Sequence, residues 1–250
     1  MEQERSLMTT LGQQDVVILC GGLGTRLRAV VSDRPKPMAL INGRPFLDLV
    51  VDHVVSQGFH RIFFSTGHHG AWIAEHVKKR TDIDAIISHE DQPLGTAGAL
   101  RACRSLLRGA TVLALNGDSL CRIDLPQLIA THHAQQAVAT VAVTLSNGRT
   151  DGGGITLDEH CRIVRFEEKK AGSYINTGIY ALQTGYLDRI PHDTPCSLER
   201  DVFPVLVTHG LYGYPCHAPL YDIGTPERLE EFRSVMHGCR IEDAEKGAPC

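Results

Sequence analysis

The chain has 250 residues, of which 42% are hydrophobic and 22% charged, and this ordinary globular composition predicts one large α/β domain, although two small domains would also fit. A formal net charge of −4 gives no electrostatic basis for binding nucleic acid or an anionic membrane surface. No apolar run approaches the ~20 residues that span a bilayer, and the N-terminus lacks the apolar core of a signal peptide, so we expect a cytoplasmic protein.

The first predicted strand, residues 16–20, is followed by a glycine-rich turn. Three glycines within residues 21–24 let the backbone turn sharply and approach a bulky anion closely. Free N–H groups in such a loop, followed by a helix start, form an anion-binding concavity. Arg26 adds a planar cation suited to phosphate, and Lys36 is a second cation, stiffened by a proline on either side. The segment therefore predicts a phosphate site with two cations.

This loop does not match two common phosphate-binding patterns. The P-loop requires a Gly-Lys-Ser/Thr sequence after the turn, and none is present. The dinucleotide fingerprint requires a third glycine where Leu27 stands, and an acidic strand end about 20 residues later. The failed fingerprint argues against a nicotinamide enzyme.

The elements expected after the loop alternate between helix and strand. In chain order they are a helix over 46–54 closed by Gly58, a strand over 61–66, a helix over 71–80, a strand over 85–88, a helix opened by Gly95 and Thr96, a strand over 111–115, a helix over 124–133 and a second strand group from residue 138. Such alternation predicts βαβ units with a mostly parallel mixed sheet flanked by helices, a Rossmann-like α/β fold. Residues 1–14 and 237–250 are expected to be tails around a single domain, 15–236.

The eight cysteines include no C-x-x-C pair, and the thirteen histidines lack metal-ligand spacing. In a chain of this length that is expected to be cytoplasmic, free thiols are favoured over disulfides. A zinc site is not expected.

Two aspartates are candidates for a metal site. Asp118 follows the strand over 111–115, and the carboxyl end of a parallel strand is where open α/β sheets bind ligands. Beside a triphosphate it would hold Mg²⁺, although a plain turn explains N-G-D equally well. Asp222 precedes a helix start. Thr225 and Pro226 are explained as cap and first turn of that helix, whereas Asp222 is not explained by capping.

The pattern G-G-x-G-T-R-L, followed ten residues after Arg26 by Lys36-Pro37, resembles the signature of the sugar-1-phosphate nucleotidylyltransferases. Further segments match in the family's order: L-G-T-A-G-A-L, N-G-D, E-E-K, N-T-G-I-Y and Y-D-I-G-T-P-E. The resemblance runs from about Val16 to Phe232. It is strongest with the branch of the family that makes GDP-D-glycero-α-D-manno-heptose from heptose 1-phosphate and GTP. One departure is Gly152-Gly153, where the family usually carries an aromatic residue before a glycine.

The resemblance implies a nucleotide half, 15–135, a smaller sugar-binding strand group, 136–236, and no C-terminal β-helix. It also implies site residues, all numbered as in this chain. They are Arg26, Lys36 and Lys169 for catalysis; Leu19, Gly21, Gly22, Gly24, Thr25, Gln92, Gly95, Thr96 and Asn116 for the nucleotide; Gly153, Glu168, Asn176, Gly178 and Glu199 for the sugar; and Asp118 with Asp222 for Mg²⁺.

The implied substrates are a nucleoside triphosphate and a sugar 1-phosphate, with neither nucleic acid nor membrane as partner, in a monomer or homodimer. Two other functions stay open. A sister-branch uridylyl-, thymidylyl- or cytidylyltransferase acting on a hexose 1-phosphate would share most of these motifs. A catalytically silent regulatory subunit is less favoured, because such relatives tend to lose the cations or metal acids that this chain keeps.

Overall fold

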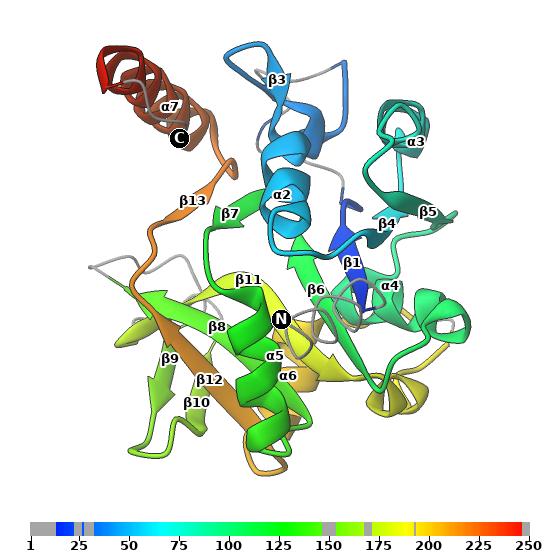
Figure 1. Ribbon diagram of the computed structural model, residues 1–250. Helices are drawn as coiled ribbons and strands as arrows, with labels where there is room; N and C mark the ends of the chain where they lie inside the picture. The colour runs from blue at the N-terminus through cyan, green and yellow to red at the C-terminus, as the bar shows by residue number, and fades with distance from the viewer. Residues whose placement is uncertain are drawn as a thin grey trace, which may run out of the picture.

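The structure, a computed structural model, describes residues 14–22, 27, 33–146, 154–167, 172–192 and 194–246, with side chains up to residue 237. Within this part of the chain a nine-stranded mixed sheet runs through the molecule with helices on both faces (Figure 1). The prediction of a mostly parallel mixed sheet flanked by helices is confirmed. None of the described helices is long and apolar enough to cross a bilayer.

The first half of the sheet is parallel and is built around β1. Its strands, in spatial order, are β6 (Thr111–Asn116), β1 (Asp15–Leu19), β4 (Arg61–Thr66) and β5 (Asp84–His89). Successive side chains of a strand point to opposite faces, so Val16 and Ile18 join one core cluster while Val17 and Leu19 join the other. The first cluster includes α2 (Phe46–Val55) and α3 (Gly70–Val77), and the second includes α4 (Gly95–Cys103). Both faces of β1 are thus buried, as its continuous apolar run predicted.

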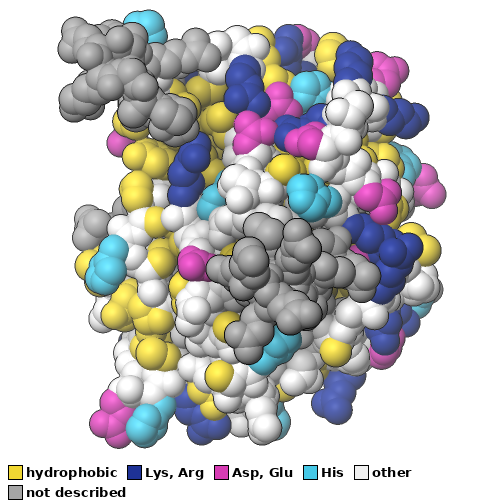
Figure 2. Space-filling model, in the orientation of Figure 1, with side chains coloured by type: hydrophobic (Ala, Val, Ile, Leu, Met, Phe, Trp, Pro, Cys, Tyr) yellow, Lys and Arg dark blue, Asp and Glu magenta, His cyan; other side chains and the backbone are white. Residues whose placement is uncertain are grey.

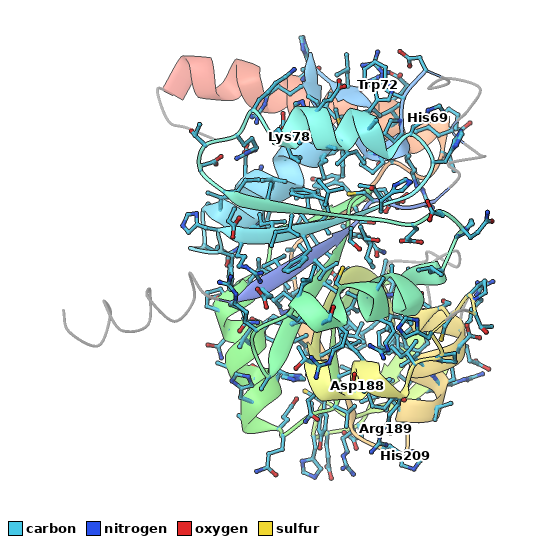
Figure 3. All side chains as sticks on the ribbon, turned by 90° about the vertical axis from the view of Figure 1, so that its right-hand side faces the viewer. His69, Trp72, Lys78, Asp188, Arg189 and His209 are labelled. Atoms are coloured by element: carbon cyan, nitrogen blue, oxygen red, sulfur yellow. The ribbon has the colours of Figure 1, made fainter. Side chains whose placement is uncertain are left out.

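The second half is joined through β11, which pairs antiparallel with β6, β8 and β9. Its strands are β8 (Ala139–Leu145), β9 (Gly154–Leu157), β10 (Ile163–Glu167), β11 (Tyr174–Gln183) and β12 (Leu211–Cys216). The helix α5 (Leu125–Ala134) packs on β8, β11 and β12. The short helical segments of the chain are η2 (Arg104–Leu106), η3 (Thr184–Arg189), η4 (Leu198–Val202) and α6 (Phe203–Leu206). Turned by 90°, the sheet is seen edge-on, with His69, Trp72 and Lys78 of the α3 region on one side and Asp188, Arg189 and His209 on the other (Figure 3).

A separate pair of short strands connects the two halves at the edge where the parallel strands end. In this pair, β7 (Ser119–Cys121) runs antiparallel to β13 (Leu220–Asp222), with Asp222 opposite Ser119. The chain then enters α7 (Pro226–Lys246), whose Arg228 N–H donates to Thr225 as the cap prediction requires. Nearby lie η1 (Lys36–Met38), β2 (Leu40–Ile41) and β3 (Arg44–Pro45).

Residues 237–250, expected to form a tail, begin within a helix, because α7 continues to Lys246. The stretch Arg240–Lys246 contains only residues of ordinary to good helix propensity, and neither glycine nor proline interrupts it before Gly247. Polarity alone was therefore a poor guide to where the helix ends.

A buried ion pair ties the start of β1 to its neighbours. Asp15 is fully buried; its carboxylate accepts from Arg61 of β4 and from the Arg108 N–H. Replacing Asp15 by alanine leaves the Arg61 guanidinium, itself only 8% exposed, without its main counter-ion. We expect this change to lower the free energy of unfolding by about 3 kcal/mol, since removing one partner of a buried pair typically costs about 3–5 kcal/mol and the exposed Asp84 gives partial compensation.

Urea denaturation followed by circular dichroism measures this loss. The control is Arg44→Ala, which breaks an ion pair of two exposed side chains and should change stability by about 0.5 kcal/mol or less. Equal effects of the two substitutions would show that burial of the Asp15 pair is unimportant.

Candidate active site

One cavity opens where the parallel strands end. It has a volume of about 670 Å³ and is lined by the ends of β1, β4 and β5 and the start of α4, as sheets of this type place ligands. Its lining residues are Leu19, Gly21, Gly22, Ser65, Gly67, His68, His69, His89, Glu90, Asp91, Pro93, Gly95, Thr96 and Ala99. Five predicted nucleotide-binding residues are among them: Leu19, Gly21, Gly22, Gly95 and Thr96.

Two of these glycines have backbone conformations that other residues avoid. Gly22 has φ +128° and Gly95 has φ +73°. A Cβ on Gly95 would lie 2.5 Å from the carbonyl oxygen of Cys196, so a side chain there would push the start of α4 away from its neighbour. The glycines therefore fix the shape of the cavity wall.

Glu90 is an acidic residue in the lining of this cavity. It follows β5 directly and is 9% exposed. Its Oε1 accepts from the Ser65 hydroxyl at 2.6 Å, and its Oε2 accepts from the Leu94 N–H at 3.0 Å. Gly21 lies against it, since a Cβ on Gly21 would be 3.3 Å from Oε1. Each carboxylate oxygen has a second acceptor site, so the fixed Glu90 can still accept hydrogen bonds from a ligand.

Four charged side chains form a compact group at the edge of the β7–β13 pair. The Lys36 Nζ is 2.6 Å from Asp118 Oδ2, and Arg228 Nη1 is 3.0 Å from Asp222 Oδ1 and 3.1 Å from Oδ2. The two pairs meet at Gly224, where a Cβ would be 2.8 Å from Asp222 Oδ1, 3.8 Å from Arg228 Nη1 and 3.9 Å from Lys36 Nζ. Antiparallel pairing of β7 with β13 brings the two aspartates together, and the Ile223 N–H donates to the Asp118 carbonyl at 3.1 Å.

The four charges sum to zero, so this centre alone does not compensate the charge of two anionic substrates. Asp118 and Asp222 are oxygen donors of the kind that Mg²⁺ uses, and Mg²⁺ needs only one or two carboxylates when phosphate oxygens complete its shell. Among the described residues no three His, Cys, Asp or Glu side chains form a metal cage. The donor set therefore fits an ion shared with a bound phosphate.

A second cavity, of about 550 Å³, adjoins the charged centre. It is lined by the end of β8, by β13 with the segment before it, and by the start of α7: Thr144, Leu145, Ser146, Ile175, His217, Ala218, Pro219, Leu220, Tyr221, Asp222, Arg228, Glu231 and Phe232. Asp222 and Arg228 belong both to this lining and to the charged centre. The charged centre therefore borders this cavity, which is large enough for part of a nucleotide sugar.

Three predicted sugar-side residues, Asn176, Gly178 and Glu199, lie in a hydrogen-bonded network. The Asn176 carboxamide accepts from the Gly178 N–H at 2.8 Å and donates to the Tyr180 hydroxyl at 2.8 Å. Glu199 accepts from Tyr180 at 2.9 Å and from Thr96 at 2.8 Å, and burial raises the pKa of Tyr180, with the Glu199 charge as a further cause. Glu199 thus links the nucleotide segment to the sugar strand rather than pointing into the second cavity.

Asn116, the last residue of β6, packs directly on Gly178. A Cβ on Gly178, whose φ is +80°, would lie 2.7 Å from the Asn116 Nδ2. Glycine at 178 is therefore required to admit this side chain. The contact joins the predicted nucleotide-binding and sugar-binding residues at the middle of the sheet.

The remaining predicted residues divide into two groups. Gln92 is exposed and does not line the cavity that its neighbour Glu90 faces. Gly24, Thr25, Arg26, Gly153, Glu168 and Lys169 lie outside the described residues, as does Gly152, so the departure next to Gly153 has no structural account.

Sequence reasoning missed Glu90 and Arg228. For Glu90 a signal was present, because an acidic residue directly after a parallel strand is a ligand-site candidate in the same way as Asp118. For Arg228 there was no signal in the motif pattern. Its role is visible only from its contact with Asp222 across the first turn of α7.

Comparison with known proteins gives a family for this chain. A family model described as nucleotidyl transferase matches residues 15–237. The mannose-1-phosphate guanylyltransferase of Mycobacterium tuberculosis is 34% identical over 223 residues, which are 86% of this chain and 62% of that protein. The D-glycero-alpha-D-manno-heptose 1-phosphate guanylyltransferase of Aneurinibacillus thermoaerophilus is 33% identical over 218 residues, 85% of this chain and 94% of that protein. The chain therefore spans somewhat less than two thirds of the mannose relative but nearly all of the heptose relative.

The fold is shared with a solved protein. The crystal structure of HddC from Yersinia pseudotuberculosis superposes with a TM-score of 0.80 at 29% identity, covering 89% of this chain and 99% of that one. The same protein complexed with GMP-PN gives a TM-score of 0.79 at 30% identity, with the same coverage.

Proposed function

The chain belongs to the nucleotidyl transferase family, and from this premise we propose that it transfers GMP from GTP to a sugar 1-phosphate, releasing pyrophosphate. The favoured acceptor is D-glycero-α-D-manno-heptose 1-phosphate. This acceptor is supported by the heptose relative, 94% of which is matched by this chain at 33% identity. Mannose 1-phosphate is the second candidate, because the mannose relative has similar identity over a similar part of the chain.

The observation that carries the choice of guanine is the buried Glu90 side chain in the cavity lining. An ionised carboxylate is only an acceptor, and guanine presents two adjacent donors, N1–H and the N2 amino group. Uracil and thymine present a single N–H between two carbonyl oxygens, so one carboxylate oxygen would face an acceptor. Cytosine offers its amino group next to an acceptor nitrogen. Guanine is thus the base whose two donors match the second acceptor site on each of the two Glu90 oxygens.

The proposed chemistry is direct displacement at the α-phosphorus of GTP. A phosphate oxygen of the sugar 1-phosphate attacks in line, the bond to the β-phosphate oxygen breaks, and pyrophosphate leaves. We place the base in the 670 Å³ cavity, the sugar toward the 550 Å³ cavity and the reacting phosphates at the charged centre. Catalysis then consists of positioning and charge neutralisation, without a covalent intermediate.

In this scheme Lys36 neutralises charge that develops on the α-phosphate oxygens, and Asp118 holds Lys36 in place before the substrates bind. Asp118 and Asp222 would hold Mg²⁺, which when bound supplies positive charge against the phosphate oxygens. Arg228 keeps the Asp222 carboxylate oriented toward the centre.

A substrate panel tests the proposal. Four nucleoside triphosphates (GTP, UTP, TTP and CTP) are crossed with the 1-phosphates of heptose, mannose and glucose, and pyrophosphate release is measured. GTP with heptose 1-phosphate is expected to give the highest kcat/KM. A clear preference for glucose 1-phosphate with UTP, TTP or CTP would assign the chain to a sister branch instead.

Replacing Glu90 by glutamine is expected to lower kcat/KM for GTP by about 10- to 100-fold and to reduce the preference for GTP over UTP. The amide turns one of two acceptors into a donor facing guanine's own donors, and each well-placed base contact is worth about 1–3 kcal/mol of discrimination. The matched variant Gln92→Ala, at an exposed neighbouring position, should leave both values within about twofold. If kcat/KM for GTP fell in Gln92→Ala but not in Glu90→Gln, the assignment of base recognition to Glu90 would be wrong.

A further inference from the structure

Two cysteines that the proposed chemistry does not use face each other near the active site. Cys121, at the end of β7, is 1% exposed, and Cys216, at the end of β12, is half-buried. Their sulfur atoms are 3.9 Å apart although the residues come from different sheets. The Cys121 sulfur also lies 3.6 Å from the carbonyl oxygen of Ala218, which accepts from the Thr144 hydroxyl at 3.1 Å.

The two cysteines lie in or next to the strands that position Asp118 and Asp222. Cys121 lies three residues after Asp118 and pairs with Leu220 of β13, and β13 ends at Asp222. Cys216 lies at the start of the segment that leads from β12 into β13 (Figure 1). A bond between the two sulfurs would therefore act directly on the β7–β13 pair.

We propose that Cys121 and Cys216 form a reversible disulfide site, and that closing the disulfide displaces the β7–β13 pair and lowers transfer activity. A disulfide is about 2.05 Å long, so the sulfurs must approach by nearly 2 Å. Shifts of about 1 Å in groups that position substrates can cost about 100-fold in rate.

The two cysteines have different parts in the reaction. Contact with the Cys121 thiol lowers the pKa of Cys216 to about 7, while the same contact and burial raise the pKa of Cys121. The thiolate is the nucleophile, and Cys216 is also the more accessible sulfur, so Cys216 attacks first.

The oxidant is a small-molecule disulfide such as oxidised glutathione. The Cys216 thiolate attacks one of its sulfurs, forming a mixed disulfide and releasing one thiolate. The Cys121 sulfur, giving up its proton, then attacks the Cys216 sulfur and releases the second small thiol. In total the two cysteine thiols lose two electrons and two protons, and the small disulfide is reduced to two thiols.

The test uses the full-length protein incubated with oxidised glutathione. Peptide mass spectrometry without reduction is expected to show one linked peptide pair containing Cys121 and Cys216, two hydrogen masses below the sum of its parts. Detection of only a glutathione adduct on Cys216 would overturn the disulfide. This readout does not depend on the proposed substrates, so it remains valid if the proposed function fails.

The activity readout rests on the proposed guanylyl transfer. Oxidation should lower kcat by about tenfold or more, dithiothreitol should restore it, and Cys121→Ser and Cys216→Ser should abolish the response. Cys161→Ser, at another half-buried thiol, is the matched control and should respond as the unmodified protein does. A fully formed Cys121–Cys216 disulfide with unchanged kcat would overturn the coupling to the active site. The comparison of kcat before and after dithiothreitol needs no variant. It therefore tests the coupling of the disulfide to activity even if a serine variant fails to fold.

Discussion

Replacement of Lys36 by methionine is expected to lower kcat for GDP-sugar formation by about 10²–10³-fold, the usual loss when one group aimed at developing transition-state charge is removed. Methionine keeps the length of the side chain and removes its charge. The Lys36 Nζ lies 2.6 Å from Asp118, and the flanking Pro35 and Pro37 restrict its backbone, so the cation is held in position before substrates bind. Its loss would also leave Asp118 facing the triphosphate with less compensation.

Lys78→Met is the matched control, because Lys78 is an exposed lysine of the α3 region at the surface (Figure 3). It should keep kcat within about twofold. Steady-state kinetics with saturating GTP, together with thermal denaturation to verify folding, measures both variants. A folded Lys36→Met protein that retained a third or more of the original kcat would show that the lysine is not part of the reaction centre.

Asp118→Asn and Asp222→Asn are each expected to lower kcat by at least about 10³-fold, and the double variant should be little worse than either single one. Asparagine keeps the shape of the side chain and removes the charge that a hard cation requires. Asp118 directly precedes β7, Asp222 ends its partner β13, and Lys36, which contacts Asp118, lies beside Asp222 near Gly224, so the two carboxylates are expected to act as one magnesium site. Loss of either carboxylate then removes most of the magnesium binding that the two provide together.

Metal binding can be measured apart from activity with Mn²⁺, whose paramagnetic signal reports the bound fraction in the presence of a non-hydrolysable GTP analogue. Both variants should bind Mn²⁺ far more weakly than the unmodified protein. Asp188→Asn, on the other side of the sheet from α3 in Figure 3, should bind it normally. Losses that multiply in the double variant, or activity that survives EDTA, would refute the shared metal site.

The order of the helices and strands could be predicted from the sequence because each has a strong local signal. The run from Val16 to Cys20 predicts a buried strand, and β1 is buried on both faces. The helix over 46–54 with Gly58 after it was found as α2 (Phe46–Val55), and Gly58 has φ +88°, as a helix-ending glycine should. These features depend only on neighbours within the chain.

The charged centre could be predicted only in part. Asp118 and Asp222 were expected to share a site on the strength of the resemblance, but the antiparallel pair that brings them together contains only three residues on each strand. Strands this short have no periodic signal. Arg228 was missed for the same reason, since its contact with Asp222 depends on how β13 leads into α7.

Glu90 and Gln92 show a different limit. Both belong to one loop, and both side chains can form hydrogen bonds to a base. Which of them faces the cavity depends on the Ser65 hydroxyl and the Leu94 N–H that hold Glu90, and these contacts are not encoded in the motif. On the face seen in Figure 2, Lys and Arg side chains are intermixed with Asp and Glu, so surface charge gave no further guide to the site.

The most direct test of the central claim follows the phosphorus atoms of GTP. The protein is incubated with Mg²⁺, heptose 1-phosphate and GTP labelled at either the α- or the γ-phosphate, and the products are separated. The label at the α-phosphate should appear in a GDP-sugar and the label at the γ-phosphate in pyrophosphate, with both products absent without the sugar phosphate. Label from the γ-phosphate appearing instead in inorganic phosphate or on the sugar, with no labelled GDP-sugar, would contradict guanylyl transfer.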